Sequence, residues 1–186
     1  MRAEQGARTR TEMGAEKGAE KGAELGVGAG AGAELTERPG FLIRRLHQIH
    51  LAMFYEACSG LNITPVQSSI LSVLARRQGL DQAGLAAMIG VDRATVGQVI
   101  RRLAARGLVE RGNSSEDKRL KLVQLTEDGR ALLDRIAPLT AAAHRRTLAA
   151  LSDEERTNFM AYLKKLVEAD NAHGRAPLRW GPALPE

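Results

Sequence analysis

The stretch LAAMIGVDRATVGQVIRRLAARGLVER, residues 85–111, contains two helical patterns with a very short connection between them. Asp92 is a suitable N-cap for the second helix, and Gly107 suits the left-handed conformation that ends many helices. The connection consists of Gly90, Val91 and Asp92 alone. Two helices joined by so short a turn containing glycine are typical of a helix-turn-helix unit.

A β-hairpin is predicted directly after this unit. Two runs of β-prone residues, 108–111 and 120–126, flank a polar loop rich in Gly, Asn and Ser. Further helices are predicted over 41–58, from a capping box at Thr64, over 127–151 with a bend at Pro138, and from a capping box at Ser152 through 167. The predicted fold class is mainly α with a small β-hairpin wing, a winged helix-turn-helix.

The two ends of the chain differ from this helical part. Residues 1–37 carry an approximate four-residue repeat of Ala, Glu, Lys and Gly, and we expect a disordered low-complexity tail. Residues 171–186 have three prolines and no periodicity, which predicts a flexible C-terminal tail. Residues 38–170 are left as one domain.

The composition favours an anionic partner. The formal net charge is +5 and the isoelectric point about 9.8. Cys58 is the single cysteine, so no intrachain disulfide can form. A reducing cytoplasm suits such a chain. The sequence has no apolar run of membrane-spanning length and no catalytic constellation. We therefore expect a cytoplasmic protein that is not an enzyme and has no membrane partner.

The helix from Asp92 to Gly107 is the predicted DNA-binding element. One side of its helical wheel is apolar and faces the core. The other side has no carboxylate and consists of Ala94, Thr95, Gly97, Gln98, Arg101, Arg102 and Ala105. Small residues at Ala94 and Gly97 would let the backbone approach base edges in a major groove. The alternative is an ordinary amphipathic helix with a solvated basic face.

Individual side chains on this helix suit different contacts with duplex DNA. The amide of Gln98 can pair with adenine, and the guanidinium of Arg101 can pair with guanine. Arg93 and Arg106, at the two ends, are placed to reach phosphates. From residue 65 to 121 there are ten Lys and Arg against five Asp and Glu, a surplus of five positive charges.

The predicted hairpin tip carries the sequence EDKR, residues 116–119. Asp117 and Arg119 lie two residues apart and point to the same side of an extended backbone. A carboxylate can aim an arginine through charge-assisted hydrogen bonds, and an aimed arginine suits a narrow minor groove. Lys118, between them, completes the predicted DNA-binding set.

Three segments together resemble the MarR family of regulators: ITPVQSSILSVL, the opening stretch LAAMIGVDRATVGQVIRRLAARGLVER, and EDKRLKLVQLTEDGRALL. The resemblance covers residues 41–167. It implies a homodimeric winged-helix protein, in most cases a repressor that a small molecule releases from a palindromic operator. It also implies that the helix from Asp92 reads the major groove and that Arg119, oriented by Asp117, enters the minor groove.

The resemblance also divides the domain. It implies a DNA-binding lobe at about 62–126 and dimerisation helices at about 41–58 and 127–168. The helix over 41–58 agrees with this, because two adjacent apolar stripes predict a wide buried face. The segment RPGFLIRRLHQIHLAMFYEAC, residues 38–58, is similar to a subgroup that regulates degradation of aromatic acids or their CoA thioesters.

The implied effector is thus an aromatic carboxylate or an aromatic acyl-CoA, with no further cofactor. In the family the effector cleft lies between the dimer helices and the DNA-binding lobe, and the first helix forms part of its wall. The candidate contacts are Arg44, His47, His50, Phe54 and Tyr55. The alternatives for the two histidines are interface or surface positions, or half of a metal site, which no cysteine or carboxylate cluster completes.

Two other functions stay open from sequence. Cys58 could be a peroxide-sensing thiol, as in one branch of the family, although those sensors carry the cysteine near the start of the first helix. A buried, inert thiol is the alternative. The winged helix could also be a protein-interaction module that does not bind DNA, which predicts little dependence of binding on salt.

Overall fold

The computed structural model describes residues 34–113 and 121–179. Three segments lie outside the described residues: residues 1–33 of the predicted N-terminal tail, residues 180–186 at the C-terminal end, and the predicted hairpin tip with Asp117, Lys118 and Arg119. Within the predicted N-terminal tail, Leu35–Glu37 form a single 3₁₀ turn, η1.

The described residues form a mainly helical structure with a small sheet, which confirms the predicted fold class. The helices are α1 (Pro39–Ala57), α2 (Pro65–Arg76), α3 (Gln82–Ile89), α4 (Arg93–Ala105), α5 (Glu127–Thr147) and α6 (Asp153–Ala169). The strands are β1 (Leu80–Asp81), β2 (Val109–Asn113) and β3 (Lys121–Leu125). All pairs in the sheet are antiparallel, in the order β1-β3-β2.

Local capping explains where most helices begin. The Thr64 hydroxyl accepts from the backbone N–H of Gln67, whose side chain accepts from the backbone N–H of Thr64. Ser152 and Glu155 make the same reciprocal pair at the start of α6. These are the predicted capping boxes, and they satisfy backbone donors that a helix start leaves unpaired.

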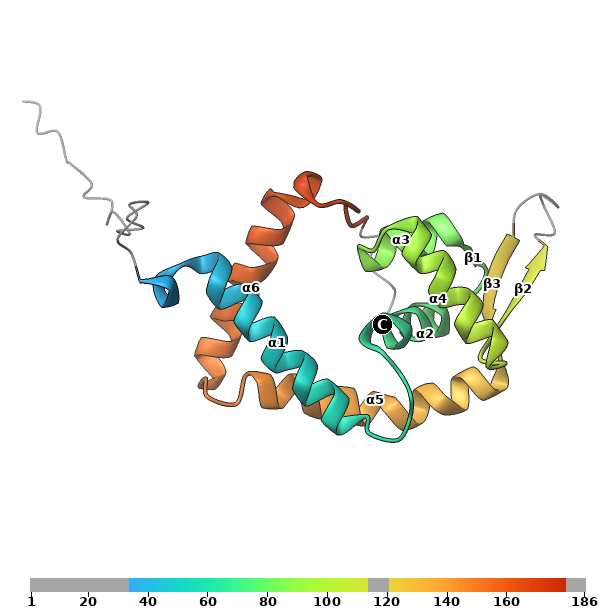
Figure 1. The fold of residues 1–186 in the computed structure, drawn as a ribbon, viewed down its shortest axis with the longest axis horizontal. Helices are drawn as coiled ribbons and strands as arrows, with labels where there is room; N and C mark the ends of the chain where they lie inside the picture. The colour runs from blue at the N-terminus through green and yellow to red at the C-terminus, as the bar shows by residue number, and fades with distance from the viewer. Residues whose placement is uncertain (1–33, 114–120, 180–186) are drawn as a thin grey trace, which may run out of the picture.

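The structure separates into two parts that share α5 (Figure 1). Helices α1 and α6 lie with one end of α5, while α2, α3, α4 and the sheet lie at its other end. The core of the second part consists of fully buried side chains from its three helices, among them Ile70, Leu71, Leu74, Leu85, Ile100 and Leu103. Burial of these apolar side chains stabilises the packing of the three short helices against one another.

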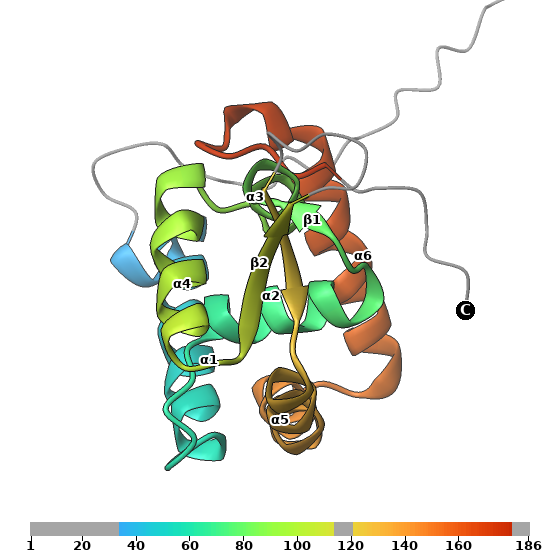
Figure 2. The same cartoon turned by 90° about the vertical axis from the view of Figure 1, so that its right-hand side faces the viewer.

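The sheet has one strand more than the predicted hairpin. Leu80 pairs with Val123 and Asp81 with Leu122, so β1 joins the outer side of β3. A strand of two residues is too short to carry an alternating pattern. Figure 2 shows α4 beside the strands at one end of the molecule.

Part of the predicted flexible C-terminal tail folds back on α3. The side-chain amide of Asn171 donates to Leu178 O and accepts from Leu178 N–H, both at 2.8 Å. The backbone N–H of Arg179 donates to Ala87 O at 2.9 Å. Residues 171–179 therefore connect the end of α6 to α3, as Figure 1 also shows.

Candidate nucleic-acid interface and effector cleft

The start of α4 is fixed by Asp92. Its carboxylate accepts a hydrogen bond from the backbone N–H of Thr95 at 2.9 Å. Hydrogen bonds from Thr95 lower the pKa of Asp92, so the cap stays charged. Val96 and Ile100 are fully buried and hold the helix against the core. The cap and the buried side chains hold α4 in place, so the residues on its opposite side are not needed for packing.

The outer face of α4, which we define as Arg93, Ala94, Thr95, Gln98, Arg101 and Arg102, is exposed. No carboxylate lies within α4. Surface helices usually mix acids and bases at i, i+4 spacing, because such pairs stabilise the helix. The outer face of α4 instead presents three guanidinium groups beside one amide and small residues, which suits a negatively charged partner.

Gly97 does not belong to this face, and its predicted exposed position is wrong. It is buried against α3, where a Cβ would lie 2.5 Å from Nε2 of Gln82. The helical wheel places Gly97 on the flank of the outward side, and the flank is covered by a neighbouring helix that the wheel does not represent. Its small size therefore makes room for a glutamine side chain of the protein itself.

Arg106 is engaged within the protein. Its guanidinium Nη1 donates to Asn62 O at 2.6 Å and Nη2 to Leu61 O at 3.4 Å. These bonds connect the end of α4 to the loop between α1 and α2. The side chain that the sequence suggested as a phosphate contact thus has a structural role in the unbound protein.

Between the two parts lies a cavity of about 520 Å³, with walls from α1, α2, α3 and α5. His47, His50 and Phe54 line it, as predicted. Two other predicted effector contacts are not among its lining residues. The Arg44 guanidinium lies over the ring of Phe41, 5.3 Å from its centre, and Tyr55 is 51% exposed.

A residue that sequence reasoning missed completes the polar part of this cavity. His144 of α5 stacks on His50, with ring centres 5.0 Å apart, and both line the cavity with His47. His50 and His144 are 94 positions apart in the sequence. Only the packing of α1 on α5 brings them together, so no local pattern could indicate the pair.

His50 is held by a hydrogen bond to α5. Its Nδ1 lies 2.8 Å from the hydroxyl of Thr147, and that hydroxyl also lies within hydrogen-bond distance of Ala143 O, at 2.9 Å. Burial, followed by the nearby His144 and His47, lowers the pKa of His50. These surroundings disfavour the charged imidazolium form of His50.

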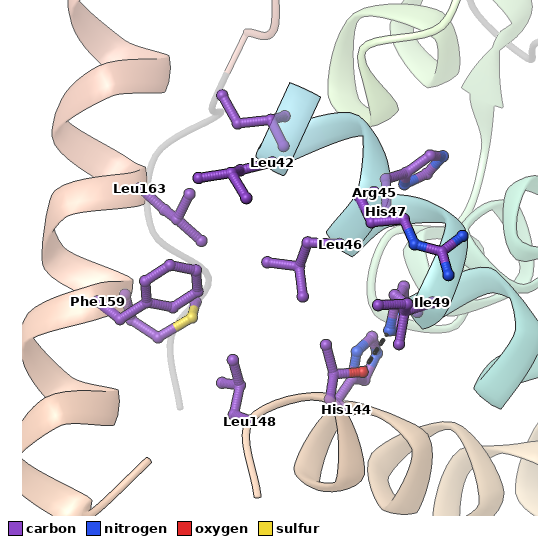
Figure 3. A pocket seen from close by; sticks show the side chains of 13 residues that line it. Leu42, Arg45, Leu46, His47, Ile49, His144, Leu148, Phe159 and Leu163 are labelled. Atoms are coloured by element: carbon purple, nitrogen blue, oxygen red, sulfur yellow. Dashed lines mark hydrogen bonds between the residues drawn. The ribbon is translucent and has the colours of Figure 1, made fainter. Parts of the chain in front are cut away.

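A second, mainly apolar cavity of about 790 Å³ lies between α1, α5 and α6. Leu42 and Leu46 of α1 face Phe159 and Leu163 of α6 across it (Figure 3). Large apolar side chains of these two helices are exposed: Leu42, Ile43 and Met160 line this cavity, and Leu166 and Val167 lie further along α6. We call this set the apolar face of α1 and α6. Several large exposed apolar side chains on two neighbouring helices are typical of an interaction surface.

The other sequence candidates do not gather into a site. Cys58 is buried, and burial raises the pKa of its thiol, which disfavours the reactive thiolate. Among residues 34–113 and 121–179, no three His, Cys, Asp or Glu side chains are arranged to hold a metal ion. No helix in the same ranges is long and apolar enough to cross a membrane.

Comparison with known proteins decides the family. The MarR family sequence model matches residues 61–120. The transcriptional repressor NicR of Pseudomonas putida is 32% identical over 141 residues, which are 76% of this chain and 89% of NicR. This chain belongs to the MarR family. It is thus a DNA-binding transcriptional regulator, and its relatives are regulators rather than enzymes.

Two solved MarR-type structures are similar over most of the chain. BpsR of Bordetella bronchiseptica, whose DNA binding is regulated by 6-hydroxynicotinic acid, is 32% identical with a TM-score of 0.71, covering 74% of this chain and 99% of BpsR. CouR of Rhodococcus jostii, solved with p-coumaroyl-CoA, is 28% identical with a TM-score of 0.64, covering 71% of this chain and 93% of CouR.

Proposed function

We propose that this MarR-family regulator is a homodimeric cytoplasmic repressor that binds a pseudo-palindromic operator and is released by a small aromatic acid. The observation that carries the proposal is the outer face of α4, which is exposed and free of acid beside a winged sheet. In this proposal Gln98 and Arg101 contact base edges, and Arg93 and Arg102 contact phosphates. From sequence alone, Asp117, Lys118 and Arg119 add a minor-groove contact.

The apolar face of α1 and α6 supports the homodimer. Leu42 is 51% exposed and Leu166 60% exposed in the single chain, and both lie on long helices that could pack against a second copy. A dimer places two copies of α4 on successive turns of the duplex, so the two half-sites should lie about 10 bp apart.

The size and chemistry of the 520 Å³ cavity favour a single-ring acid as effector. Pockets of roughly 300–1,000 Å³ hold drug-sized ligands, whereas the bulk of an acyl-CoA would have to extend outside this one. Ser68, Ser72 and Thr140 supply hydroxyl groups for a carboxylate, and Nε2 of His50 can accept from a ring hydroxyl. The ligand of BpsR has this chemistry, and we extend it to this chain.

Footprinting on the DNA upstream of the neighbouring genes tests DNA binding by the full chain. A protected pseudo-palindrome, with affinity that falls steeply as salt rises, is the expected result. A protein-interaction module would give no protected site and little salt dependence. The same footprint repeated with 6-hydroxynicotinate should lose protection, whereas benzoate, which lacks the ring hydroxyl, should act more weakly.

Oxidation gives the competing redox-sensing function a separate test. Because Cys58 is buried, the footprint should persist after treatment with peroxide, and Cys58→Ser should bind as the parent does. A footprint that peroxide abolishes in the parent but not in Cys58→Ser would favour the redox sensor over the ligand-released repressor.

A further inference from the structure

One directional contact joins the two helices of the helix-turn-helix unit. Gln82 is the first residue of α3, and its side-chain Nε2 donates to the backbone oxygen of Arg93, the first residue of α4, at 2.7 Å. Gln82 is partly buried in this position. A side-chain bond to main chain fixes the backbone of α4 itself rather than one of its side chains.

Gly97 makes this contact possible. A Cβ there would lie 2.5 Å from Nε2, 3.0 Å from Cδ and 3.2 Å from Oε1 of Gln82, so the Gln82 amide occupies the space that a side chain at position 97 would take. Gly97 does not have positive φ, unlike Gly90 and Gly107. The backbone of α4 therefore does not require glycine at this position, and the space for the Gln82 amide does.

The contact lies next to the residues proposed to read DNA. The backbone oxygen of Arg93 and the buried Gly97, which Gln82 contacts, are one helical turn apart, and each is followed directly by an exposed residue, Ala94 or Gln98. Buried apolar side chains such as Val96 and Ile100 also hold α4, but apolar burial is non-directional. A hydrogen bond at the first turn restrains the rotation of α4 and its separation from α3 much more strictly.

We propose that Gln82 is a positioning residue for DNA recognition, and that Gly97 is glycine because it receives the Gln82 amide. The inference rests on the proposed function, in which Gln98 and Arg101 contact base edges. Bidentate contacts with bases tolerate little displacement, so a small rotation of α4 lowers the preference for the correct sequence. Phosphate contacts through long arginine side chains adapt to the same rotation, so non-specific affinity is preserved.

The test uses the full chain and two duplexes of equal length. One is the sequence that the parent enriches most strongly from a random library, and the other is a scrambled version of it. Fluorescence anisotropy at one salt concentration gives the ratio of the two affinities. Gly97→Ala, which displaces the Gln82 amide, and Gln82→Ala, which removes it, should each lower this ratio by roughly two- to three-fold, with affinity for the scrambled duplex within about two-fold of the parent.

The double variant is the decisive member of the set. Once the Gln82 amide is removed, the methyl added at position 97 has no amide to displace. The double variant should therefore resemble Gln82→Ala rather than multiply the two losses. Gly40→Ala is the matched control, because it adds the same methyl in the first turn of α1 where nothing lies within 4 Å. Its ratio should equal that of the parent.

Three other outcomes would overturn the inference, each in a distinct way. Single variants that keep the parental ratio would show that the contact does not position α4. Equal losses on both duplexes would show that Gln82 supports DNA binding of any sequence rather than the position of α4. If Gly97→Ala does not fold, Gln82→Ala, which only removes atoms, decides alone. A parent that prefers no duplex would refute the proposed function, and the inference with it.

Discussion

Two exposed surfaces of this regulator differ in the partner that each can accept. The outer face of α4 is polar and basic, whereas the apolar face of α1 and α6 presents leucine, isoleucine, methionine and valine side chains. Water solvates the first at little cost and the second poorly. The outer face of α4 can therefore stay exposed to solvent in the DNA-free protein. The apolar face of α1 and α6 should instead be covered by a second copy whether or not DNA is bound.

The largest effect is expected from a charge on the apolar face. Leu42→Asp should dissociate the dimer and weaken operator binding by at least about 100-fold, because a monomer engages one half-site without the gain from linking two. Since Leu42 is half exposed, the monomer itself should still fold. Sedimentation velocity and anisotropy measure both effects. Gln48→Asp, exposed on the same helix, is the control and should remain dimeric.

A smaller loss is expected on the basic face. Arg101→Ala should cost about 1–3 kcal/mol of operator binding and relax the preferred base at one position of each half-site. It should leave the dimer intact, which separates the two surfaces. Anisotropy on the operator and on variants with single base changes gives the result. Lys164→Ala, an exposed cation of α6, should bind the operator as the parent does.

Arg106 tests where the basic face ends. Arg106→Ala removes the bonds to Asn62 and Leu61 and should lower the free energy of unfolding by about 1 kcal/mol. The slope of operator affinity against salt should not change, since no phosphate contact is lost. Urea unfolding and a salt series supply the two readouts. A shallower salt slope with parental stability would instead assign Arg106 to the DNA-binding surface.

The smallest effect concerns His50, between the two surfaces. Its pKa in the folded protein is lowered, so the unfolded chain binds the proton more tightly. The stability that this group contributes is complete above pH 6.5, the ordinary histidine pKa, and is lost as the pH falls through 6.5 toward the folded pKa. Urea unfolding between pH 7.5 and 5 should show a shallower decline in His50→Asn than in the parent, and an equal decline would contradict the shift.

What the sequence could predict depended on how local each interaction is. The capping pairs Thr64 with Gln67 and Ser152 with Glu155 lie within one turn, so the residues themselves indicate them. The winged helix-turn-helix followed from the short turn and the hairpin. The two-residue strand β1 is too short for any pattern.

Long-range contacts are where the prediction of the site was incomplete. The His50–His144 stack joins α1 to α5, and the Gln82–Gly97 contact joins α3 to α4. A helical wheel describes one helix without its neighbours, and for that reason it placed Gly97 on the outer face. The bond from Arg106 to Asn62 O, 44 positions away, is a further long-range contact that the position of Arg106 at the helix end does not indicate.

The role of the outer face of α4 is tested most directly by repeating the selection from a random duplex library with Gln98→Ala. The parent should enrich a pseudo-palindrome with half-sites about 10 bp apart. The variant should enrich the same spacing, but with no base preference at one position of each half-site. If the variant enriches the parental sequence at every position with undiminished affinity, α4 does not read the bases.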